Sequence, residues 1–139
     1  MKVKNILFSV IIPTFNNSRF LKLAIESVLS QTYTNFEILI INNNSTDDTS
    51  RIISSFNDFR ISEFKINNSG VIAKSRNMGI RLSKGEWICF LDSDDKWYKS
   101  RLETILKNIQ KYFKFDVFTT NEFKSFINSS KKKKLFYGP

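Results

Sequence analysis

Hydrophobic residues along this chain form short continuous runs separated by stretches with helical spacing. Three runs, at 8–12, 38–41 and 87–91, are apolar without alternation, which is typical of strands covered on both faces of a sheet. Between the runs, apolar residues recur three or four positions apart, as on one face of an amphipathic helix. Strands that alternate with helices predict an α/β fold, with a Rossmann-like, mostly parallel sheet and helices on both faces.

The pattern also predicts where the elements begin and end. Pro13 ends the first strand, because proline cannot donate to a sheet ladder. Ser45 is expected to cap the second helix, with a carboxylate at Asp48 three residues later. The third helix should bury Val71 among other residues. The expected strands are 8–12, 36–41, 61–66, 86–91 and 116–123, and the expected helices lie near 20–30, 45–56, 71–83 and 102–113, with no strong pattern over 131–139.

Polar side chains follow three of the expected strands. They form the clusters Thr14–Asn16, Asn42–Asn44 and Asp92–Asp95. Because ligands bind at the carboxyl ends of the strands in open α/β sheets, we expect these clusters to lie along one edge. Three clusters at one edge favour a functional site over incidental turn chemistry.

The last cluster places the carboxylates Asp92, Asp94 and Asp95 within four residues. Like charges this close repel unless a cation or an array of donors compensates them. A divalent metal is the simplest compensator, since Mg²⁺ sites use one or two carboxylates plus substrate phosphates. The alternative is an acidic turn that caps the following helix.

Composition narrows the chemistry. The 139 residues suit one domain, and a net charge of +9 favours anionic partners such as nucleotide phosphates, nucleic acid or anionic lipid. The chain has no histidine, which excludes a His base or a Ser-His-Asp triad within it. Its one cysteine, Cys89, is expected to be a small buried thiol. Neither a dinucleotide-binding glycine motif nor a P-loop motif is present. The basic N-terminus precedes too short an apolar run for a signal peptide, which favours a cytoplasmic location.

Three further side chains are candidates for ligand contact. Arg76 could form bidentate contacts to diphosphate oxygens, or it could be an exposed helix arginine. Phe15 could stack on a nucleobase, or it could pack in the core. Asn43 could hydrogen-bond a base edge, or it could only shape its turn.

A set of sequence segments runs in unbroken order from about Ser9 to about Leu102. The segments are Ser9–Asn16, Ala24–Tyr33, Phe36–Ile38, Asn44–Thr49, Ser75–Gly79 and Gly85–Asp95, the last containing the D-x-D sequence Asp92-Ser93-Asp94. This ordered set resembles the start of the inverting family 2 glycosyltransferases.

The resemblance implies the nucleotide-binding half of a GT-A fold. It implies transfer, with inversion, from a nucleotide-diphosphate sugar, expected to be UDP-linked, to a glycan or lipid-linked acceptor in surface polysaccharide synthesis. The implied donor-binding residues are Pro13, Phe15, Asn16, Asn43, Arg76, Asp92 and Ser93. The implied cofactor is Mg²⁺ or Mn²⁺, held by Asp94 and Asp92, with Asp94 the expected direct ligand and the metal stabilising the leaving diphosphate.

The sequence departs from the family in two ways. The family usually has at least one Asp at the pair that is Asn42 and Asn43 here. Its members also carry a second half that supplies the acceptor site and the carboxylate base, so no catalytic base is assigned in this chain. We expect a donor-binding half at 1–125 and a basic segment at 126–139 from a truncated acceptor half. The alternatives are an inactive nucleotide-sugar-binding remnant and, less favoured, a sugar nucleotidylyltransferase, whose glycine- and arginine-rich N-terminal loop is absent.

The basic run Lys131–Lys134 suggests one further partner. It could contact anionic lipid at the inner face of the cell membrane, or it could be a solvated tail. Nucleic acid is not expected as a partner, because no recognition module accompanies the positive charge.

Overall fold

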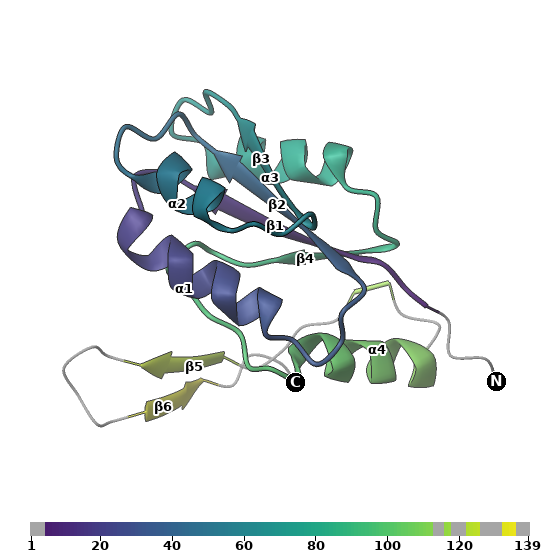
Figure 1. Cartoon of the computed structure of the whole chain (residues 1–139). Helices are drawn as coiled ribbons and strands as arrows, with labels where there is room; N and C mark the ends of the chain where they lie inside the picture. Colours follow the sequence, from purple (N-terminus) through teal and green to yellow (C-terminus); the bar gives the residue numbers. More distant parts are fainter. Residues whose placement is uncertain (1–4, 113–115, 118–121, 126–131, 136–139) are drawn as a thin grey trace. The chain divides into compact units, whose positions relative to one another are not determined.

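The first compact unit of the protein is built on a parallel sheet. The computed structural model describes residues 5–112, 116–117, 122–125 and 132–135 (Figure 1), and the chain divides into two compact units, residues 1–104 and 105–139. The sheet of the first unit has four strands in the order β3-β2-β1-β4, and every neighbouring pair is parallel. Its strands are β1 (Phe8–Thr14), β2 (Phe36–Asn42), β3 (Ile61–Lys65) and β4 (Trp87–Phe90).

Helices cover both faces of this sheet. Figure 1 shows α3 (Ile72–Leu82) on one face and α1 (Ser18–Leu29) with α2 (Thr49–Ser55) on the other. The α/β class and the parallel sheet predicted from the sequence are therefore confirmed. A fourth helix, α4 (Arg101–Lys111), begins in the first unit, and the second unit contains an antiparallel pair, β5 (Glu122–Ser125) and β6 (Lys132–Leu135).

The face under α3 is closely packed. Ile11, Leu39 and Ile41 form its buried centre, and Met78 and Leu82 of α3 pack against them. A Cβ added at position 79 of this helix would lie 2.5 Å from a methyl carbon of that central β1 isoleucine, so the glycine there permits the close approach. These contacts hold the second half of α3 closely against β1 and β2.

The opposite face is covered by α1. Its Leu21, Ala24, Ile25 and Val28 are fully buried, as the helical spacing of these residues predicts. Beyond the helix, the buried Gln31 side chain joins two distant segments. Its Nε2 donates to the Tyr98 carbonyl over 2.8 Å, and its Oε1 accepts the Leu102 backbone N–H over 3.0 Å. This amide fixes the segment after the acidic turn to the end of α1.

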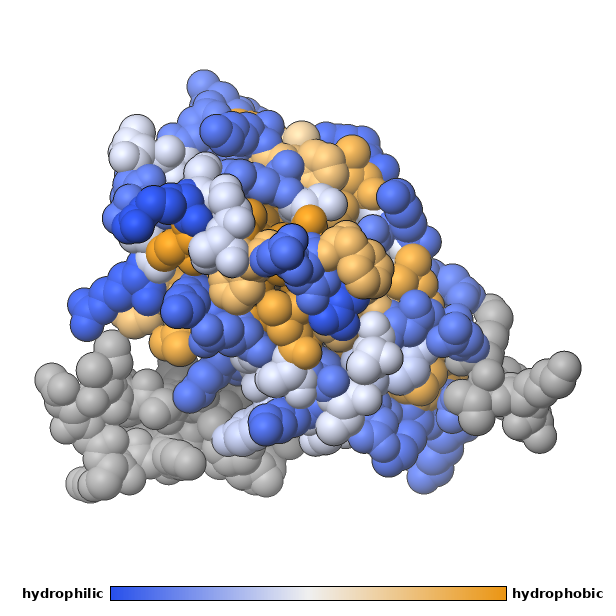
Figure 2. All heavy atoms as spheres, in the orientation of Figure 1, coloured by the Kyte–Doolittle hydropathy of each residue, from blue (hydrophilic) through white to orange (hydrophobic). Residues whose placement is uncertain are grey.

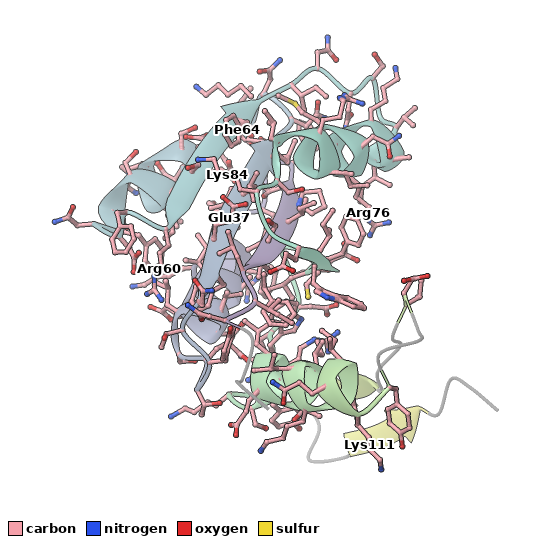
Figure 3. All side chains as sticks on the ribbon, turned by 90° about the vertical axis from the view of Figure 1, so that its right-hand side faces the viewer. Glu37, Arg60, Phe64, Arg76, Lys84 and Lys111 are labelled. Carbon is pink, nitrogen blue, oxygen red and sulfur yellow. The ribbon has the colours of Figure 1, made fainter. Side chains whose placement is uncertain are left out.

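A polar network closes the amino-terminal edge of the sheet, away from the carboxyl ends of the strands. The Glu37 Oε1 atom accepts the Ser9 hydroxyl and the Lys84 backbone N–H, each over 2.6 Å. Figure 3 shows Glu37 and Lys84 near one another. Gly85 follows, where a Cβ would lie 2.6 Å from the backbone nitrogen of that serine, so the loop before β4 needs a glycine.

Several element boundaries correct the sequence-based expectations. The second helix begins at Thr49 rather than near Ser45, and it has no cap bond from Ser45. Val71 precedes α3 and is 45% exposed, because it lies just before the helix and not over the core. Of the last predicted strand, Asp116 and Val117 are not in a strand, and residues 118–121 lie outside the described residues. The strand β6 lies where no pattern was found.

β4 is not covered on both faces as its apolar run predicts. It is an edge strand of the described sheet, and Phe90 is 41% exposed. Cys89 is a free thiol, as expected, but it is only partly buried. Its surroundings still raise the pKa of the thiol to about 11 through desolvation, so it stays protonated. Over the described residues, the face in Figure 2 is a mosaic of hydrophobic areas among hydrophilic side chains. Among the helices of those residues, none has the length and apolarity needed to cross a membrane.

Candidate functional site

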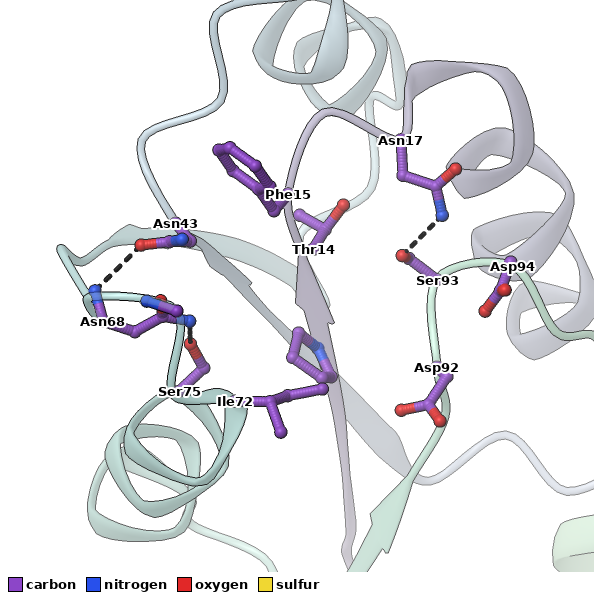
Figure 4. Close-up of a pocket in the computed structure, with 12 residues that line it drawn as sticks. Thr14, Phe15, Asn17, Asn43, Asn68, Ile72, Ser75, Asp92, Ser93 and Asp94 are labelled. Carbon is purple, nitrogen blue, oxygen red and sulfur yellow. Dashed lines mark hydrogen bonds between the residues drawn. The ribbon is translucent and has the colours of Figure 1, made fainter.

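A pocket opens at the carboxyl edge of the sheet, where the strand order changes direction. From β1 the chain builds outward through β2 and β3, then returns to the other side of β1 for β4. Crevices at such switch points are the usual ligand sites of open α/β sheets. The pocket has a volume of about 390 Å³ (Figure 4). Its lining residues are Pro13, Thr14, Phe15, Asn17, Asn43, Asn68, Gly70, Ile72, Ser75, Asp92, Ser93 and Asp94.

The three polar clusters predicted from the sequence thus meet at one edge. Among the candidate residues, those that line the pocket are Pro13, Phe15, Asn43, Asp92, Ser93 and Asp94. Asn16 and Arg76 do not line it. Asn16 is exposed and holds its loop in place, whereas Arg76 reaches the pocket through an ion pair with an aspartate.

The acidic turn follows β4 and is partly exposed. Its backbone closes through the Asp95 N–H, which donates to the Asp92 carbonyl over 3.0 Å. Ser93 is buried, and its hydroxyl accepts from Asn17 Nδ2 over 2.7 Å, which joins the turn to the start of α1 (Figure 4). Asp94 is exposed and faces the pocket. The turn is therefore anchored at its serine and open at its carboxylates.

Arg76 approaches this turn from α3. Its Nη2 donates to Asp92 Oδ1 over 2.8 Å, and its guanidinium carbon lies 5.7 Å from the centroid of the Phe90 ring. The Nε atom is buried and has no hydrogen-bond partner among the described residues. Arg76 is therefore not simply an exposed helix arginine, because it places a positive charge beside the acidic turn.

The other side of the pocket is built from amides. Asn43 Oδ1 accepts the Asn68 backbone N–H over 2.8 Å, so this oxygen is committed and the Nδ2 group is the part of the side chain left for a ligand. The Asn68 side chain is buried, donates to Ser75 Oγ over 2.9 Å and accepts the Gly70 N–H over 2.9 Å. Asn68 therefore shapes this wall, and its own polar atoms are used in doing so.

Phe15 stands above this wall on a strained loop. It is 58% exposed, which excludes the core-packing alternative for this ring. The next residue, Asn16, has a φ of 45°, a left-handed conformation that Asn tolerates. Its Oδ1 accepts the Thr46 N–H over 2.8 Å, and its own N–H donates to Ser45 Oγ over 2.9 Å. The loops after β1 and β2 are thus tied together and hold the exposed ring over the pocket.

Asp47 strengthens this tie between the two loops. One carboxylate oxygen accepts the Thr49 N–H and hydroxyl at the start of α2, and the other accepts the Ser18 N–H at the start of α1. The Thr49 hydroxyl is the largest cause that lowers the pKa of Asp47 from 3.8 to about 2, and the contacts from Ser18 lower it further. A single carboxylate therefore caps the starts of both α1 and α2, and at α2 it takes the role predicted for Ser45.

Two features of the pocket leave capacity for an anionic, polar ligand. The Thr14 hydroxyl is buried in the lining and has no hydrogen-bond partner among the described residues. The start of α3 has no side-chain cap bond, and Gly70 and Ile72 at this start line the pocket. Free N–H groups at a helix start favour negative charge. The start of α3 therefore favours a negatively charged group such as a diphosphate over an uncharged apolar ligand.

The fit of a divalent metal is limited to two carboxylates. Over the described residues, no group of three His, Cys, Asp or Glu side chains is arranged to hold a metal. Asp92 and Asp94 both line the pocket, which matches Mg²⁺ sites that use one or two carboxylates and complete their shell with phosphate oxygens and water. The residues therefore suit a metal that arrives with a diphosphate better than a permanently bound ion.

The family model for glycosyl transferase family 2 matches residues 9–136 of the chain. The chain belongs to this family. The match runs through the sheet and the pocket described above and confirms the resemblance found in the sequence.

Family 2 relatives agree with the match. The chain is 51% identical over 100 residues to an uncharacterised glycosyltransferase of Rickettsia felis, covering 71% of this chain and 16% of the relative. It is 43% identical over 96 residues to the Escherichia coli UDP-Glc:alpha-D-GlcNAc-diphosphoundecaprenol beta-1,3-glucosyltransferase WfaP, covering 69% and 38%. Among solved structures, Staphylococcus aureus TarS (residues 1–349) in complex with UDP superposes with a TM-score of 0.73 at 30% identity, covering 76% and 32%. The fold is thus of the GT-A type, and the chain spans well under half of the length of these relatives.

Sequence reasoning missed several residues that build the site. Asn17 anchors Ser93, Asn68 anchors Asn43, and Thr14 contributes the unsatisfied hydroxyl. The signal for Asn17 was present, because it lies in the same polar loop as Phe15. The role of Asn68 had no local signal, because asparagine is common in turns. Only the structure shows that its backbone N–H bonds to Asn43 in the loop after another strand.

Proposed function

We propose that this chain binds a nucleotide-diphosphate sugar, most simply a UDP-sugar, as the donor-binding half of an inverting glycosyltransferase. The observation that carries the proposal is the pocket at the switch point, which combines an exposed aromatic ring, a free amide donor and two carboxylates in one cavity of about 390 Å³. The structures of TarS with UDP and with UDP-GlcNAc support this donor class, since TarS shares the fold at 30% identity.

The proposed roles follow the two sides of the pocket. Phe15 stacks on the nucleobase, and the Asn43 amide donates to a base acceptor, while Pro13 lines the pocket beneath them. On the other side, Asp92 contacts the ribose, and Ser93 keeps the turn in position through its bond to α1. Arg76 offers a guanidinium close to the diphosphate. Asn16 contributes by holding the Phe15 loop rather than through direct contact.

Asp94 and Asp92 would hold Mg²⁺ or Mn²⁺ together with the diphosphate. When bound, such a metal offsets the negative charge of the leaving nucleoside diphosphate. The residues of the chain itself orient the donor: the stacked base and the anchored turn fix its two ends. Inversion needs a carboxylate that deprotonates the acceptor hydroxyl from the opposite side of the sugar, and we assign that role to no residue of this chain.

The acceptor is proposed to be a glycan or a lipid-linked sugar in surface polysaccharide synthesis. The name of WfaP, whose acceptor is a diphosphoundecaprenol-linked sugar, supports a lipid-linked acceptor. Such an acceptor lies at a membrane, so we propose cytoplasmic action at its inner face, with the basic run Lys131–Lys134 as the contact to anionic lipid.

Calorimetric titration of the chain with UDP and UDP-sugars, with and without Mn²⁺, tests the proposal. We expect binding that strengthens at least tenfold with Mn²⁺ and that loses this gain in Asp94→Asn. The matched control is Asp95→Asn, which removes the same charge from the same turn at a residue outside the pocket lining. The proposal is wrong if no nucleotide sugar binds in the presence of the metal.

A further inference from the structure

A polar network holds the turn that carries Asn43, and its residues lie outside the pocket lining. Asn42, the last residue of β2, is fully buried, and each polar group of its side chain is used. Its Oδ1 accepts the Ser45 N–H over 2.9 Å. Its Nδ2 donates to Glu63 Oε1 over 2.7 Å and to Ser50 Oγ over 3.2 Å. The network joins β2, α2 and β3 directly beneath the pocket wall.

Glu63 is the acceptor at the centre of this network. The same Oε1 atom receives the Asn42 amide and the Ser50 hydroxyl, the latter over 2.8 Å. Glu63 comes from β3, whose register with β2 pairs it with Ile40. A side chain of the edge strand therefore holds the end of β2 from the side away from β1, and it needs a donor at position 42 to do so.

We propose that Glu63 is a positioning residue of the nucleotide pocket and that its carboxylate requires a neutral amide, rather than a carboxylate, at position 42. This inference rests on the proposed function, because it concerns how the Asn43 wall is held for a nucleotide. Asn43 follows Asn42 directly, its N–H donates to the Thr14 carbonyl over 2.9 Å, and its side chain accepts from Asn68. If Asn42 moved, Asn43 would move with it, and both of these hydrogen bonds would be weakened or lost.

Charge decides the direction of the effect. The substitution Asn42→Asp would place a carboxylate oxygen about where Nδ2 now lies, 2.7 Å from Glu63 Oε1. Two carboxylates at hydrogen-bond distance cannot both remain ionised without repulsion, so one of them takes up a proton or the turn moves. The substitution Glu63→Gln would remove the conflict, because the new amide can donate to a carboxylate at position 42 or accept from the native Asn42.

The test is a four-protein cycle of wild type, Asn42→Asp, Glu63→Gln and the double variant, titrated with UDP and Mn²⁺ from pH 5.5 to 8.5. We expect Asn42→Asp to lose at least tenfold in UDP affinity at pH 8.5 and to recover most of it at pH 5.5. The double variant should bind within about threefold of wild type with no such pH dependence. Asn67→Asp, which adds the same charge at an exposed turn residue whose Oδ1 accepts a backbone N–H, should bind like wild type.

A second readout separates this inference from the proposed function. Amide resonances of Asn43 and Asn68, followed by NMR in the same four proteins, should shift in Asn42→Asp and return in the double variant. If the wild type fails to bind UDP, the proposed function fails, and the NMR cycle still decides the positioning role. Wild-type affinity in Asn42→Asp, unshifted resonances, or a double variant no better than Asn42→Asp would overturn the inference.

Discussion

Arg76 donates from Nη2 to Asp92 Oδ1 across 2.8 Å, so a cation of the chain already lies beside a carboxylate expected to bind a metal. The Arg76 and Asp92 side chains are 36% and 46% exposed, so solvent screening weakens the pair. The pair has two opposite consequences for ligands. The guanidinium opposes a divalent cation at Asp92, yet it attracts a diphosphate that arrives with one.

Replacing Arg76 with Gln should therefore change two affinities in opposite directions. We expect Mn²⁺ alone to bind a few-fold more tightly, since a positive charge next to Asp92 is removed. We expect UDP with Mn²⁺ to bind about tenfold more weakly, because a charge-assisted contact to the diphosphate is lost. Calorimetry measures both. Arg81→Gln, at an exposed position in the last turn of the same helix, is the control and should change neither. Weaker Mn²⁺ binding in Arg76→Gln would contradict this account.

The order of elements and the shared sheet edge could be predicted from the sequence. Runs such as 8–12 and 38–41 are almost entirely apolar, which by itself indicates buried strands. The exposure of Phe90 could not, since an apolar run does not reveal whether its strand lies at the edge of the sheet. The local pattern also predicts Ser45, and not Asp47, as the cap of α2. Asp47 takes that role because α1, distant in sequence, supplies a second N–H for the same carboxylate.

The parts of the site that could be predicted are those whose signal lies within a few neighbouring residues. Three aspartates directly after a strand, as at Asp92–Asp95, predict an acidic turn at the carboxyl edge of the sheet, and Asp92 and Asp94 do line the pocket there. In the sequence, Asn42 and Asn43 are an equivalent pair of amides where the family usually has at least one Asp. The structure separates the two, since the first is buried against Glu63 and only the second lines the pocket. That difference depends on the pairing of β2 with β3, which a sequence pattern does not contain.

Phe15→Ala should weaken nucleotide binding with little effect on folding. The ring is 58% exposed, so its removal costs little buried apolar surface. Stacking of a base on an aromatic ring contributes about 1–3 kcal/mol, and we expect UDP affinity to fall by roughly tenfold or more. Phe59→Ala is the matched control, because Phe59 is 97% exposed and lies outside the pocket lining. Equal UDP affinities for the two variants, measured by calorimetry, would mean that Phe15 does not stack on the base.

Asp47 should make the stability of the first unit depend on pH in the acid range. Its pKa is lowered to about 2, chiefly by the Thr49 hydroxyl, so its contribution is complete above pH 4 and is lost as the pH falls toward 2. Asp47→Asn should unfold at lower urea concentration than wild type at pH 7, and the two midpoints should converge near pH 2. Asp48→Asn removes a neighbouring carboxylate whose partner, Arg51, is exposed, and it should have a much smaller effect at pH 7. A difference between Asp47→Asn and wild type that persists unchanged at pH 2 would contradict the capping role.

The Thr14 hydroxyl is expected to lower the stability of the protein and to raise its affinity for ligand. Its buried hydroxyl has no hydrogen-bond partner among the described residues, and an unsatisfied buried hydroxyl costs about 1–3 kcal/mol. Thr14→Val keeps the shape of the side chain and removes this group. We expect the free energy of unfolding in urea to rise by about 1 kcal/mol and UDP affinity to fall about threefold to tenfold, since the ligand loses a hydrogen bond.

Thr14→Ser distinguishes the hydroxyl from the methyl group at this position. Serine retains the hydrogen-bonding group and loses a buried methyl, so this variant should be less stable than wild type by about 1 kcal/mol and should bind UDP at nearly wild-type affinity. In Thr14→Val, stability would rise while UDP affinity falls. In Thr14→Ser, stability would fall while UDP affinity stays nearly the same. If Thr14→Val is less stable than wild type, the hydroxyl has a partner when the protein is free in solution. If it binds UDP with unchanged affinity, the hydroxyl does not contact the nucleotide.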